Sequence, residues 1–484
     1  MGHLKEIIIM NILFCTSEMY PYAKSGGLGD VAQSLPEALR KTNKVYTILP
    51  LYKTIDREKF DIVYDDFSFD YFLNGIRHQL DIFVNKNNKY EVFIYNPILC
   101  DRDGLYYDDN GDFGDNALRF GLFSHACLEF MIRRNLKIDA IHVNDWQTAL
   151  IPMLAKTKYN LTQKTVLTIH NLAYQGVFDK VVMDVLELDW NQCFKHDGIE
   201  YYDNVNFLKA GIYFSDEVTT VSPTYASEIQ TPLFGNDLDD TLRINSFKLS
   251  GILNGVSYEI FNPKTDPMVY KNFDIKEYED KFTNKKKLLK EIGFVEAEKP
   301  LFVFIGRFTS QKGVDLLIES LNQFKDFEAN MIILGSGEEH YNTVFNNISV
   351  SYPNVYIKVG YDESFARKLY ASADFLLMPS SFEPCGLNQM ICMKYGVLPI
   401  VAKTGGLNDT VVDFTDVDYD RLKDFIGIGI TYEEHNSFWF MHAIAKGLSL
   451  YGNHKKFVKT SKHNMKVDNS WKHSAKEYIE LYKR

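Results

Sequence analysis

The sequence predicts an α/β protein with two domains, each built on a parallel β-sheet. Short apolar runs alternate with longer helical patterns along the chain, and a less regular region at roughly 255–300 separates two such series. This alternation is typical of βαβ units, whose strands lie parallel. The length of 484 residues exceeds what one ordinary core accommodates and suits two domains.

The apolar runs of strand length fall into two series of five. They lie at 7–15, 45–49, 140–143, 165–169 and 217–221, and then at 301–305, 331–334, 355–359, 375–378 and 398–401. The end of the chain, at 470–482, has a helical pattern. We therefore expect one domain over 1–260 and a second over 261–460. The remaining residues, 461–484, are expected to form a C-terminal helix that packs back towards the first domain.

Charge and hydropathy exclude several classes of protein. The net charge is −11 and no long basic run contains aromatic residues, so nucleic acid is not expected as a partner. The run 285–287 is Lys-Lys-Lys and predicts a solvated helix face. No apolar stretch approaches the roughly 18 residues of a membrane span. A hydrophobic content of 45% excludes disorder as the dominant state.

The cysteines and the start of the chain indicate a cytoplasmic protein. Six cysteines are scattered without a CxxC pair, which fits reduced thiols better than a disulfide or zinc framework. Asn11 interrupts the apolar start and no small-residue cleavage site follows, so this segment predicts a buried strand rather than a signal peptide. Without an HxH or HExxH cluster, neither a metal nor a cofactor is expected. The oligomeric state stays open.

Glycine-rich or charged clusters follow the predicted strands directly. They lie at 24–27, 144–146 and 170–171 in the first half, and at 306–307, 335–337, 360–361, around 383 and at 404–406 in the second. Ligands bind outside the carboxyl ends of the strands in open parallel sheets. Two sheets with such clusters predict a site in the cleft between two Rossmann-like domains, where glycines let backbone amides approach phosphate.

Each motif taken alone also has a structural explanation. Arg307 and Lys312 straddle a turn and could hold one diphosphate, or could be ordinary surface cations. Glu383 could bind sugar hydroxyls or cap a helix. Asp145 could contact a sugar or serve as a helix N-cap, and its neighbour Trp146 could present an aromatic face or belong to the core. His170 is equally ambiguous, and no P-loop is present.

The motifs are more specific as an ordered set. They are KSGGLGDV (24–31), HVNDWQT (142–148), TIHNLAYQG (168–176), VSPTYASEI (221–229), GILNGV (251–256), GRFTSQKGVDLL (306–317), EPCGLNQM (383–390) and TGGLNDTV (404–411). Together they closely resemble the family of bacterial glycogen synthases and plant starch synthases, over nearly the whole chain. The resemblance implies the GT-B fold, two Rossmann-like parallel-sheet domains facing each other across a cleft. It also implies metal-independent, retaining transfer of glucose from ADP-glucose to the non-reducing end of an α-1,4-glucan such as glycogen.

The resemblance also implies a role for individual residues. The groups at the leaving diphosphate would be Arg307 and Lys312, with Thr404, Gly405 and Gly406 near the phosphates. The groups around the transferred glucosyl unit would be Asp145, His170, Asn171, Asn254 and Glu383, with Cys385 and Gly386 beside it. Tyr361 would stack on adenine. From the first domain, Lys24 and the amides of Gly26 and Gly27 would contact the donor, and Asp145, Trp146 and Gln147 would lie on the acceptor side.

The chain departs from the family pattern at a few positions, and two alternatives stay open. Ser25 stands where many members have Thr or Val, and Gln147 where many have His. Ser257 and Phe261 replace a usual Asp and Trp, and Ile391 occupies the place of a second Glu found in the wider retaining family. The alternatives are another GT-B transferase that uses a UDP-sugar, and a non-catalytic glucan-binding homologue. No GxGxxG motif links a strand to a helix, which argues against a dehydrogenase.

Overall fold

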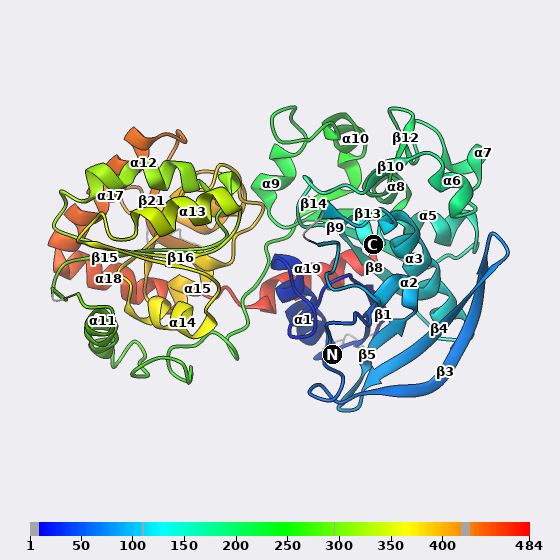
Figure 1. Cartoon of the computed structure of the whole chain (residues 1–484), viewed down its shortest axis with the longest axis horizontal. Helices are drawn as coiled ribbons and strands as arrows, with labels where there is room; N and C mark the ends of the chain where they lie inside the picture. Colours follow the sequence, from blue (N-terminus) through cyan, green and yellow to red (C-terminus); the bar gives the residue numbers. More distant parts are fainter. Residues whose placement is uncertain (1–8, 109–110, 295, 418–425) are drawn as a thin grey trace, which may run out of the picture. The chain divides into compact units, whose positions relative to one another are not determined.

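The computed structural model describes residues 9–108, 111–294, 296–417 and 426–484, which form two compact units (Figure 1). Unit 1 contains the chain up to Val221, then Ala226–Gly255 and Trp471–Arg484. Unit 2 contains Ser222–Tyr225 and Val256–Ser470. The sequence placed the domain boundaries at 260 and 460, and the main segment of unit 2 begins at Val256 and ends at Ser470.

Unit 1 is built on a mixed sheet that is mostly parallel. Its described residues form nine strands in the order β14-β13-β9-β8-β1-β2-β5-β4-β3, and all neighbours from β14 to β5 are parallel. The parallel strands are β1 (Asn11–Cys15), β2 (Lys44–Pro50), β5 (Asn88–Tyr95), β8 (Ala140–Asn144), β9 (Lys164–Ile169), β13 (Glu217–Thr220) and β14 (Leu249–Gly251). All five predicted strands of the first half are confirmed within a few residues, although residues 7 and 8 of the first lie outside the described residues.

The antiparallel extension of this sheet is a hairpin that the sequence analysis missed. Strand β3 (Ile62–Leu73) pairs with β4 (Ile76–Asn85), and β4 pairs antiparallel with β5. Asn74 and Gly75 connect the strands with φ angles of 50° and 72°. An Asn-Gly pair with both φ angles positive is the preferred two-residue hairpin connection, because its twist matches that of the strands. The signal was therefore present in the sequence.

Helices and two small sheets complete unit 1. The helices are α1 (Gly27–Arg40), α2 (Pro97–Cys100), α3 (Asn116–Arg133), α4 (Asp145–Thr148), α5 (Leu150–Thr157), α6 (Val182–Val185), α7 (Trp190–Cys193), α8 (Phe207–Phe214), α10 (Asp239–Ile244) and α19 (Trp471–Lys483). Helix α9 (Pro223–Glu228) begins in unit 2 and ends in unit 1. The small sheets contain β6 (Tyr107–Asp108) with β7 (Gly111–Asp112), and β10 (Val177–Asp179), β12 (Asn204–Asn206) and β11 (Glu200–Tyr201).

The C-terminal helix α19 packs against α1 inside unit 1. The Tyr482 hydroxyl lies 2.7 Å from His142 Nδ1, and the other ring nitrogen lies 2.7 Å from the Thr168 hydroxyl. Burial lowers the pKa of His142 to about 3, so the ring is neutral. The last residues of the chain therefore contact the middle of β8, the strand that leads into Asp145.

Unit 2 is built on a parallel sheet. In the part of the chain that the structure describes it has seven strands, in the order β17-β16-β15-β18-β19-β21-β20. The strands are β15 (Leu301–Ile305), β16 (Asn330–Gly335), β17 (Val355–Val359), β18 (Phe375–Met378), β19 (Leu398–Ala402), β20 (Val411–Asp413) and β21 (Gly427–Tyr432). The five strands predicted for the second half are confirmed as β15 to β19. Their residues are largely buried, as expected for a parallel sheet covered on both faces.

Helices cover both faces of this sheet, with α12, α13 and α17 on one face and α14 and α15 on the other (Figure 1). The helices of unit 2 are α11 (Asp280–Glu291), α12 (Val314–Phe324), α13 (Glu339–Ile348), α14 (Glu363–Ser372), α15 (Asn388–Lys394), α16 (Gly405–Thr410), α17 (Ser437–Gly452) and α18 (His454–Asn464). Among the described residues, no helix is both long and apolar enough to cross a membrane.

The prediction of a solvated face for the lysine run is wrong for Lys285. Helix α11 packs against α14, and this buries the Lys285 side chain to 2% exposure. Its ammonium group lies 2.6 Å from the Asp374 carboxylate, which also accepts the backbone N–H of Leu301 at 2.8 Å. Lys286 and Lys287 are exposed, as predicted.

Replacing Asp374 with alanine should destabilise unit 2 by about 3–5 kcal/mol, because it leaves the Lys285 ammonium buried without its anion. Unfolding in denaturant, followed by a probe in unit 2, measures this. The matched control is Glu296→Ala, because Glu296 forms an exposed ion pair with Lys299 and its loss should cost about 0–1 kcal/mol. Equal effects of the two substitutions would contradict the buried-pair interpretation.

Candidate active site

The predicted residues of unit 2 gather at the carboxyl ends of its strands. Arg307 and Lys312 follow β15, Tyr361 follows β17, Glu383 follows β18 and Thr404 follows β19. Because β17, β15, β18 and β19 lie in one parallel sheet, their carboxyl ends are at the same edge. The structure therefore places these groups on one edge of unit 2.

A direct ion pair lies at the centre of this edge. The Lys312 ammonium is 2.5 Å from the Glu383 carboxylate, which also accepts the Ser380 hydroxyl at 3.1 Å. The Glu383 side chain is 7% exposed and that of Lys312 is 22% exposed. Arg307 is exposed on the same turn. A buried carboxylate paired with one cation, with a second cation in the same loop, is suited to an anionic ligand that carries a sugar.

Gly313 is required for the backbone path that brings Lys312 to this pair. Its φ angle is +70°, and a Cβ atom there would lie 1.8 Å from the Pro379 carbonyl oxygen. A residue with a side chain would both strain the turn and collide with backbone. The turn after β15 and the loop after β18 therefore approach each other as closely as backbone allows.

The predicted glycine turn after β19 packs on the loop that carries Glu383. The Gly406 N–H donates to the Glu383 carbonyl at 3.1 Å. A Cβ atom on Gly405, whose φ angle is +43°, would lie 2.0 Å from the same carbonyl oxygen. The next loop residues are also fixed, because Gln389 Nε2 donates to the carbonyls of Cys385 and Gly386. These contacts hold Glu383 at the strand edge.

Tyr361 has a different environment from the other residues of this edge. It is 81% exposed, and its hydroxyl donates to the Glu363 carboxylate at 2.8 Å. Glu363 in turn accepts from Arg367 Nε at 2.6 Å, one helical turn further along α14. The hydrogen bond fixes the hydroxyl end while the ring face stays exposed. This is the geometry in which a flat base can stack on the ring.

In unit 1, Asp145 lies at the junction of β8 and α4. Its φ angle of +53° is unusual for a residue other than glycine. The carboxylate accepts the His170 N–H at 2.7 Å, and the Asn171 amide also bonds to it. It therefore holds the loop after β9 and does not cap its own helix, whose N-cap residue is Asn144.

His170 is held as a neutral ring on the same edge. Asn144 Nδ2 donates to the Cys15 carbonyl at 2.9 Å, so its amide oxygen is directed at His170 Nε2, also 2.9 Å away. This arrangement assigns the proton to Nε2 and leaves Nδ1 as an acceptor. Burial lowers the pKa of His170 to about 3, so the ring carries no charge at neutral pH.

Two predicted residues of unit 1 have buried amide oxygens with no hydrogen-bond partner among the described residues. They are Asn254 Oδ1 and Gln147 Oε1, and these side chains belong to residues only 7% and 6% exposed. Buried polar atoms in native proteins nearly always have partners, so such oxygens favour a site that receives donors from a ligand. Sugar hydroxyl groups are donors of this kind. Asn171, in contrast, uses its side-chain oxygen to accept the Ala173 N–H at 3.1 Å.

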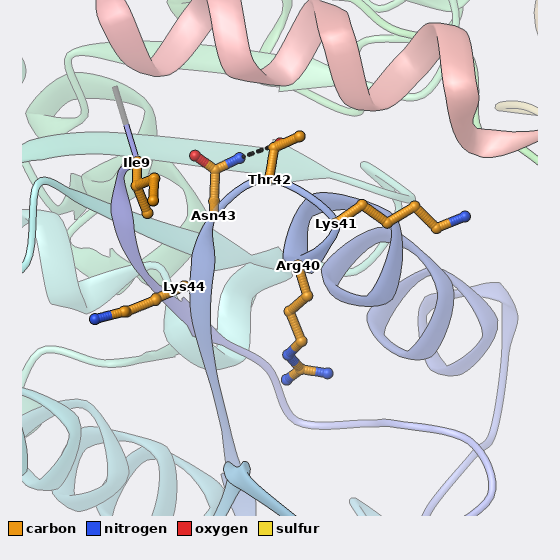
Figure 2. Close-up of a pocket in the computed structure, with 6 residues that line it drawn as sticks. All are labelled: Ile9, Arg40, Lys41, Thr42, Asn43 and Lys44. Carbon is orange, nitrogen blue, oxygen red and sulfur yellow. Dashed lines mark hydrogen bonds between the residues drawn. The ribbon is translucent and has the colours of Figure 1, made fainter. Parts of the chain in front are cut away.

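A cavity of about 420 Å³ in unit 1 is lined by none of these residues. It is lined by Ile9 and by Arg40–Lys44, between the end of α1 and the start of β2, which is the amino end of that strand. Figure 2 shows that the side chains of Arg40, Lys41 and Lys44 point in different directions. Arg40 donates to the Val45 carbonyl and the Thr47 hydroxyl. The cations do not converge, so this cavity is not a candidate phosphate site.

Comparison with known proteins identifies the family. A model of the starch synthase catalytic domain matches residues 11–244, and a model of the glycosyl transferases group 1 matches residues 285–462. The glycogen synthase of Aquifex aeolicus is 44% identical over 98% of both chains, and that of Thermosipho melanesiensis is 40% identical over 98% of this chain and 99% of its own. The catalytic domain of starch synthase IV from Arabidopsis thaliana, solved with ADP and acarbose, is 34% identical with a TM-score of 0.89, over 98% of this chain and 99% of that one.

The chain belongs to the glycogen synthase and starch synthase family. Its two parallel-sheet α/β units are those of the GT-B fold, as the sequence predicted. The alternative of a dehydrogenase is thereby excluded. In this family member, the sequence-predicted groups lie at the carboxyl ends of the strands in each unit.

The environments of Trp146 and Gly26 differ from the roles that the family resemblance implied for them. Trp146 is 8% exposed and packs edge-on against Phe120 and Phe178, with ring centroids 5.1 and 5.6 Å apart. Its environment favours the core interpretation over a sugar platform. The Gly26 N–H, expected to face the donor, donates instead to the Glu18 carboxylate at 3.1 Å. Gly27 is the first residue of α1, and Lys24 forms an ion pair with Asp30 at 2.7 Å.

Glu18 is the residue of this edge that sequence reasoning missed. It is 4% exposed and lies in the loop after β1. No short motif includes it, because its partners lie seven or more positions away in the sequence. The available signal was an acidic residue shortly after a buried strand, similar to the signal that selected Asp145, which follows its strand directly.

Asp145→Asn should change the pH dependence of stability. Burial raises the pKa of Asp145 from 3.8 to about 7, against the opposing hydrogen bonds from His170 and Asn171. A carboxyl whose pKa is raised on folding binds more protons in the folded state, so wild-type stability falls as pH rises from about 4 to 7. Asn does not titrate. The stability of the variant relative to wild type should therefore increase across this window, by at most about 1.4 kcal/mol per pH unit.

Unfolding in denaturant at several pH values measures the difference, with Asp216→Asn as the matched control. Burial raises the pKa of Asp216, but the Lys156 ammonium and the Thr165 hydrogen bonds outweigh it, so its pKa is lowered. The stability difference for that variant should stay flat between pH 5 and 8. The same flat profile for Asp145→Asn would refute the assignment.

Proposed function

We propose that this chain transfers glucose from ADP-glucose to the 4-hydroxyl at the non-reducing end of an α-1,4-glucan, with retention of configuration. The observation that carries the proposal is the ion pair of Lys312 and Glu383 at the carboxyl edge of unit 2, with Arg307 in the same loop as Lys312. It combines cations for a diphosphate with a carboxylate for a sugar. The full-length relatives named glycogen synthase support the acceptor, and the plant enzyme that binds ADP supports an adenine nucleotide.

Charge stabilisation is the main catalytic task in this proposal. When the bond between glucose C1 and the phosphate oxygen breaks, negative charge grows on ADP. Arg307 can bind two phosphate oxygens at once, and Lys312 contributes a point charge. Because Lys312 and Glu383 are in direct contact, the Lys312 ammonium reaches the phosphate from a position next to the carboxylate that binds the sugar. The cations of the chain itself perform this work.

The sugar is held by polar groups that neither attack nor leave. Glu383 and Asp145 stabilise the positive charge that develops on the glucosyl ring, and the buried oxygens of Asn254 and Gln147 accept its hydroxyls or those of the acceptor. The acceptor 4-hydroxyl attacks C1 from the side of the departing phosphate and transfers its proton to a phosphate oxygen. A covalent intermediate on Glu383 is the alternative route to retention.

The charges at the site argue against a non-catalytic glucan-binding homologue. Such a protein no longer needs donor-site charges, whereas Lys24, Arg307, Lys312 and Glu383 are all present. The partners proposed are thus ADP-glucose and the glucan, with no nucleic acid. The proposed compartment is the cytoplasm, which the six buried cysteines support, because reduced thiols persist there.

Arg307→Ala and Lys312→Ala should each lower turnover by about 10²–10³-fold, because each removes a charged donor from the developing charge. If both act on one leaving group, the double variant should lose less than the product of the two effects. Label transferred from ADP-glucose to glycogen measures turnover, and melting temperature monitors the fold. Lys290→Ala, an exposed cation on α11, is the control. Near-wild-type turnover of both single variants would remove the diphosphate site.

ADP-glucose should be strongly preferred to UDP-glucose, because Tyr361 offers an exposed ring to which the larger adenine presents more stacking area. Parallel incubations with each labelled donor and glycogen decide this, with label counted in the polymer. Tyr361→Ala should narrow the preference mainly by raising KM for ADP-glucose. Equal or faster transfer from UDP-glucose by the wild-type protein would favour the UDP-sugar alternative.

A further inference from the structure

The Glu18 carboxylate accepts hydrogen bonds from the glycine-containing loop at Lys24–Gly27 in unit 1. One oxygen, Oε2, accepts the backbone N–H groups of Ser25 at 2.7 Å and Gly26 at 3.1 Å. The other, Oε1, accepts the Ser25 hydroxyl at 2.6 Å and the Tyr106 hydroxyl at 2.9 Å. Burial and the Glu18 charge raise the pKa of Tyr106 well above its ordinary value, so this hydroxyl remains a donor. Four donors thus compensate one buried negative charge.

The Glu18 carboxylate binds the same backbone N–H groups that could otherwise bind phosphate. Successive backbone N–H groups in a glycine-rich loop form a concavity that attracts anions. Here the anion is a side chain of the chain itself, so the Gly26 N–H is already bonded. A donor phosphate next to Glu18 would also meet a negative charge. A contact from this loop to the donor would therefore use a group other than the Ser25 and Gly26 amides.

The Lys24 side chain extends from this loop and is held in place along α1. Its stem packs on α1, where a Cβ atom on Gly29 would lie 2.9 Å from Lys24 Cγ. Its ammonium forms an ion pair with Asp30 at 2.7 Å and the side chain remains 38% exposed. The loop backbone is closed on the other side by the reciprocal hydrogen bonds of Met19 and Ala23. Fixing Ser25 and Gly26 therefore fixes the backbone from which Lys24 extends.

We propose that Glu18 is a positioning residue that holds the Lys24–Gly27 loop for the nucleotide-sugar diphosphate, and that the loop contacts the donor through Lys24 and not through the Gly26 amide. The inference rests on the proposed function for the identity of the donor. Ser25 contributes to holding the loop in this chain, since its hydroxyl donates one of the four hydrogen bonds to Glu18. Tyr106 connects Glu18 to the aromatic cluster around Trp146, next to Asp145.

The test is Glu18→Gln, which keeps the shape of the side chain but removes its charge. In one orientation the new amide presents its N–H₂ group to the N–H groups of Ser25 and Gly26, and in the other it presents an uncharged oxygen. Losing hydrogen bonds to a charged acceptor should raise KM for ADP-glucose by about tenfold or more, with a smaller change in kcat and no change in KM for glycogen. Calorimetric titration with ADP should show a matching loss of affinity. Amide hydrogen exchange at Ser25 and Gly26 should accelerate.

Asp216→Asn is the matched control. Asp216 accepts the N–H and the hydroxyl of one residue, Thr165, both at 2.8 Å, as Glu18 does with Ser25. It lies at the amino ends of β9 and β13, on the opposite edge of the sheet. This variant should accelerate exchange near Thr165 but leave KM for ADP-glucose unchanged.

Three results would overturn the inference. Faster exchange at Ser25 and Gly26 with unchanged KM and ADP affinity would mean that Glu18 has a structural role only. A lower KM would mean that Glu18 competes with the donor for the amides. Should Glu18→Gln not fold, Ser25→Ala and Tyr106→Phe each remove one hydrogen bond and must raise KM in the same direction, or the inference fails.

Failure of the proposed function would look different. A wild-type protein that transfers no glucose from ADP-glucose but binds ADP refutes the transfer reaction, while the ADP affinities of the Glu18 and Asp216 variants still decide the role of the loop. A wild-type protein that neither transfers glucose nor binds ADP would overturn both.

Discussion

Buried carboxylates that accept backbone N–H groups hold the loops of this protein at the ends of its strands. Removing a carboxylate from water is costly unless hydrogen bonds replace the lost solvent. Glu18 accepts two amides of the loop after β1, and Asp145 accepts an amide of the loop after β9. In unit 2, buried carboxylates bind strands instead, because Asp374 accepts the N–H of Leu301 in β15 and Asp413 accepts that of Thr431 in β21. The loops carrying the chemistry are thereby fixed by the same bonds that make the buried charges tolerable.

This constraint also determines the electrostatics of the site. Where only backbone N–H groups bond to a buried carboxylate, as for Asp145, the effect of desolvation is larger than that of the hydrogen bonds, and the pKa rises to about 7. Where a cation completes the set, as for Asp413 with Lys446, hydrogen bonds outweigh burial and the pKa falls. Glu383 likewise has a cation, Lys312, as its direct partner. An enzyme that must stabilise opposite charges on neighbouring atoms gains from having both kinds of carboxylate already in place.

Close backbone contacts complete the preorganisation of unit 2. Gly313 and Gly405 allow the loops after β15, β18 and β19 to touch carbonyl to Cα, with no side chain between them. Protein interiors are packed densely enough that such contacts transmit position accurately. Glu383 is therefore held by its neighbours' backbones as well as by Lys312. The family resemblance at these glycines has a packing explanation that is independent of any contact they make with phosphate.

The sequence by itself determined five strands of each sheet, the GT-B fold and the strand ends at which the chemistry is placed. Apolar periodicity reports the burial of a run, and parallel strands must present their following loops at one edge. Only the tertiary structure decided how individual polar side chains are used. Lys285 looked solvated because its anion, Asp374, is 89 residues away, and Trp146 became core because Phe120 and Phe178 surround it. The Gly26 amide is bonded to Glu18 for the same reason: the partner of a polar group is set by the folded path of the chain, which local pattern does not contain.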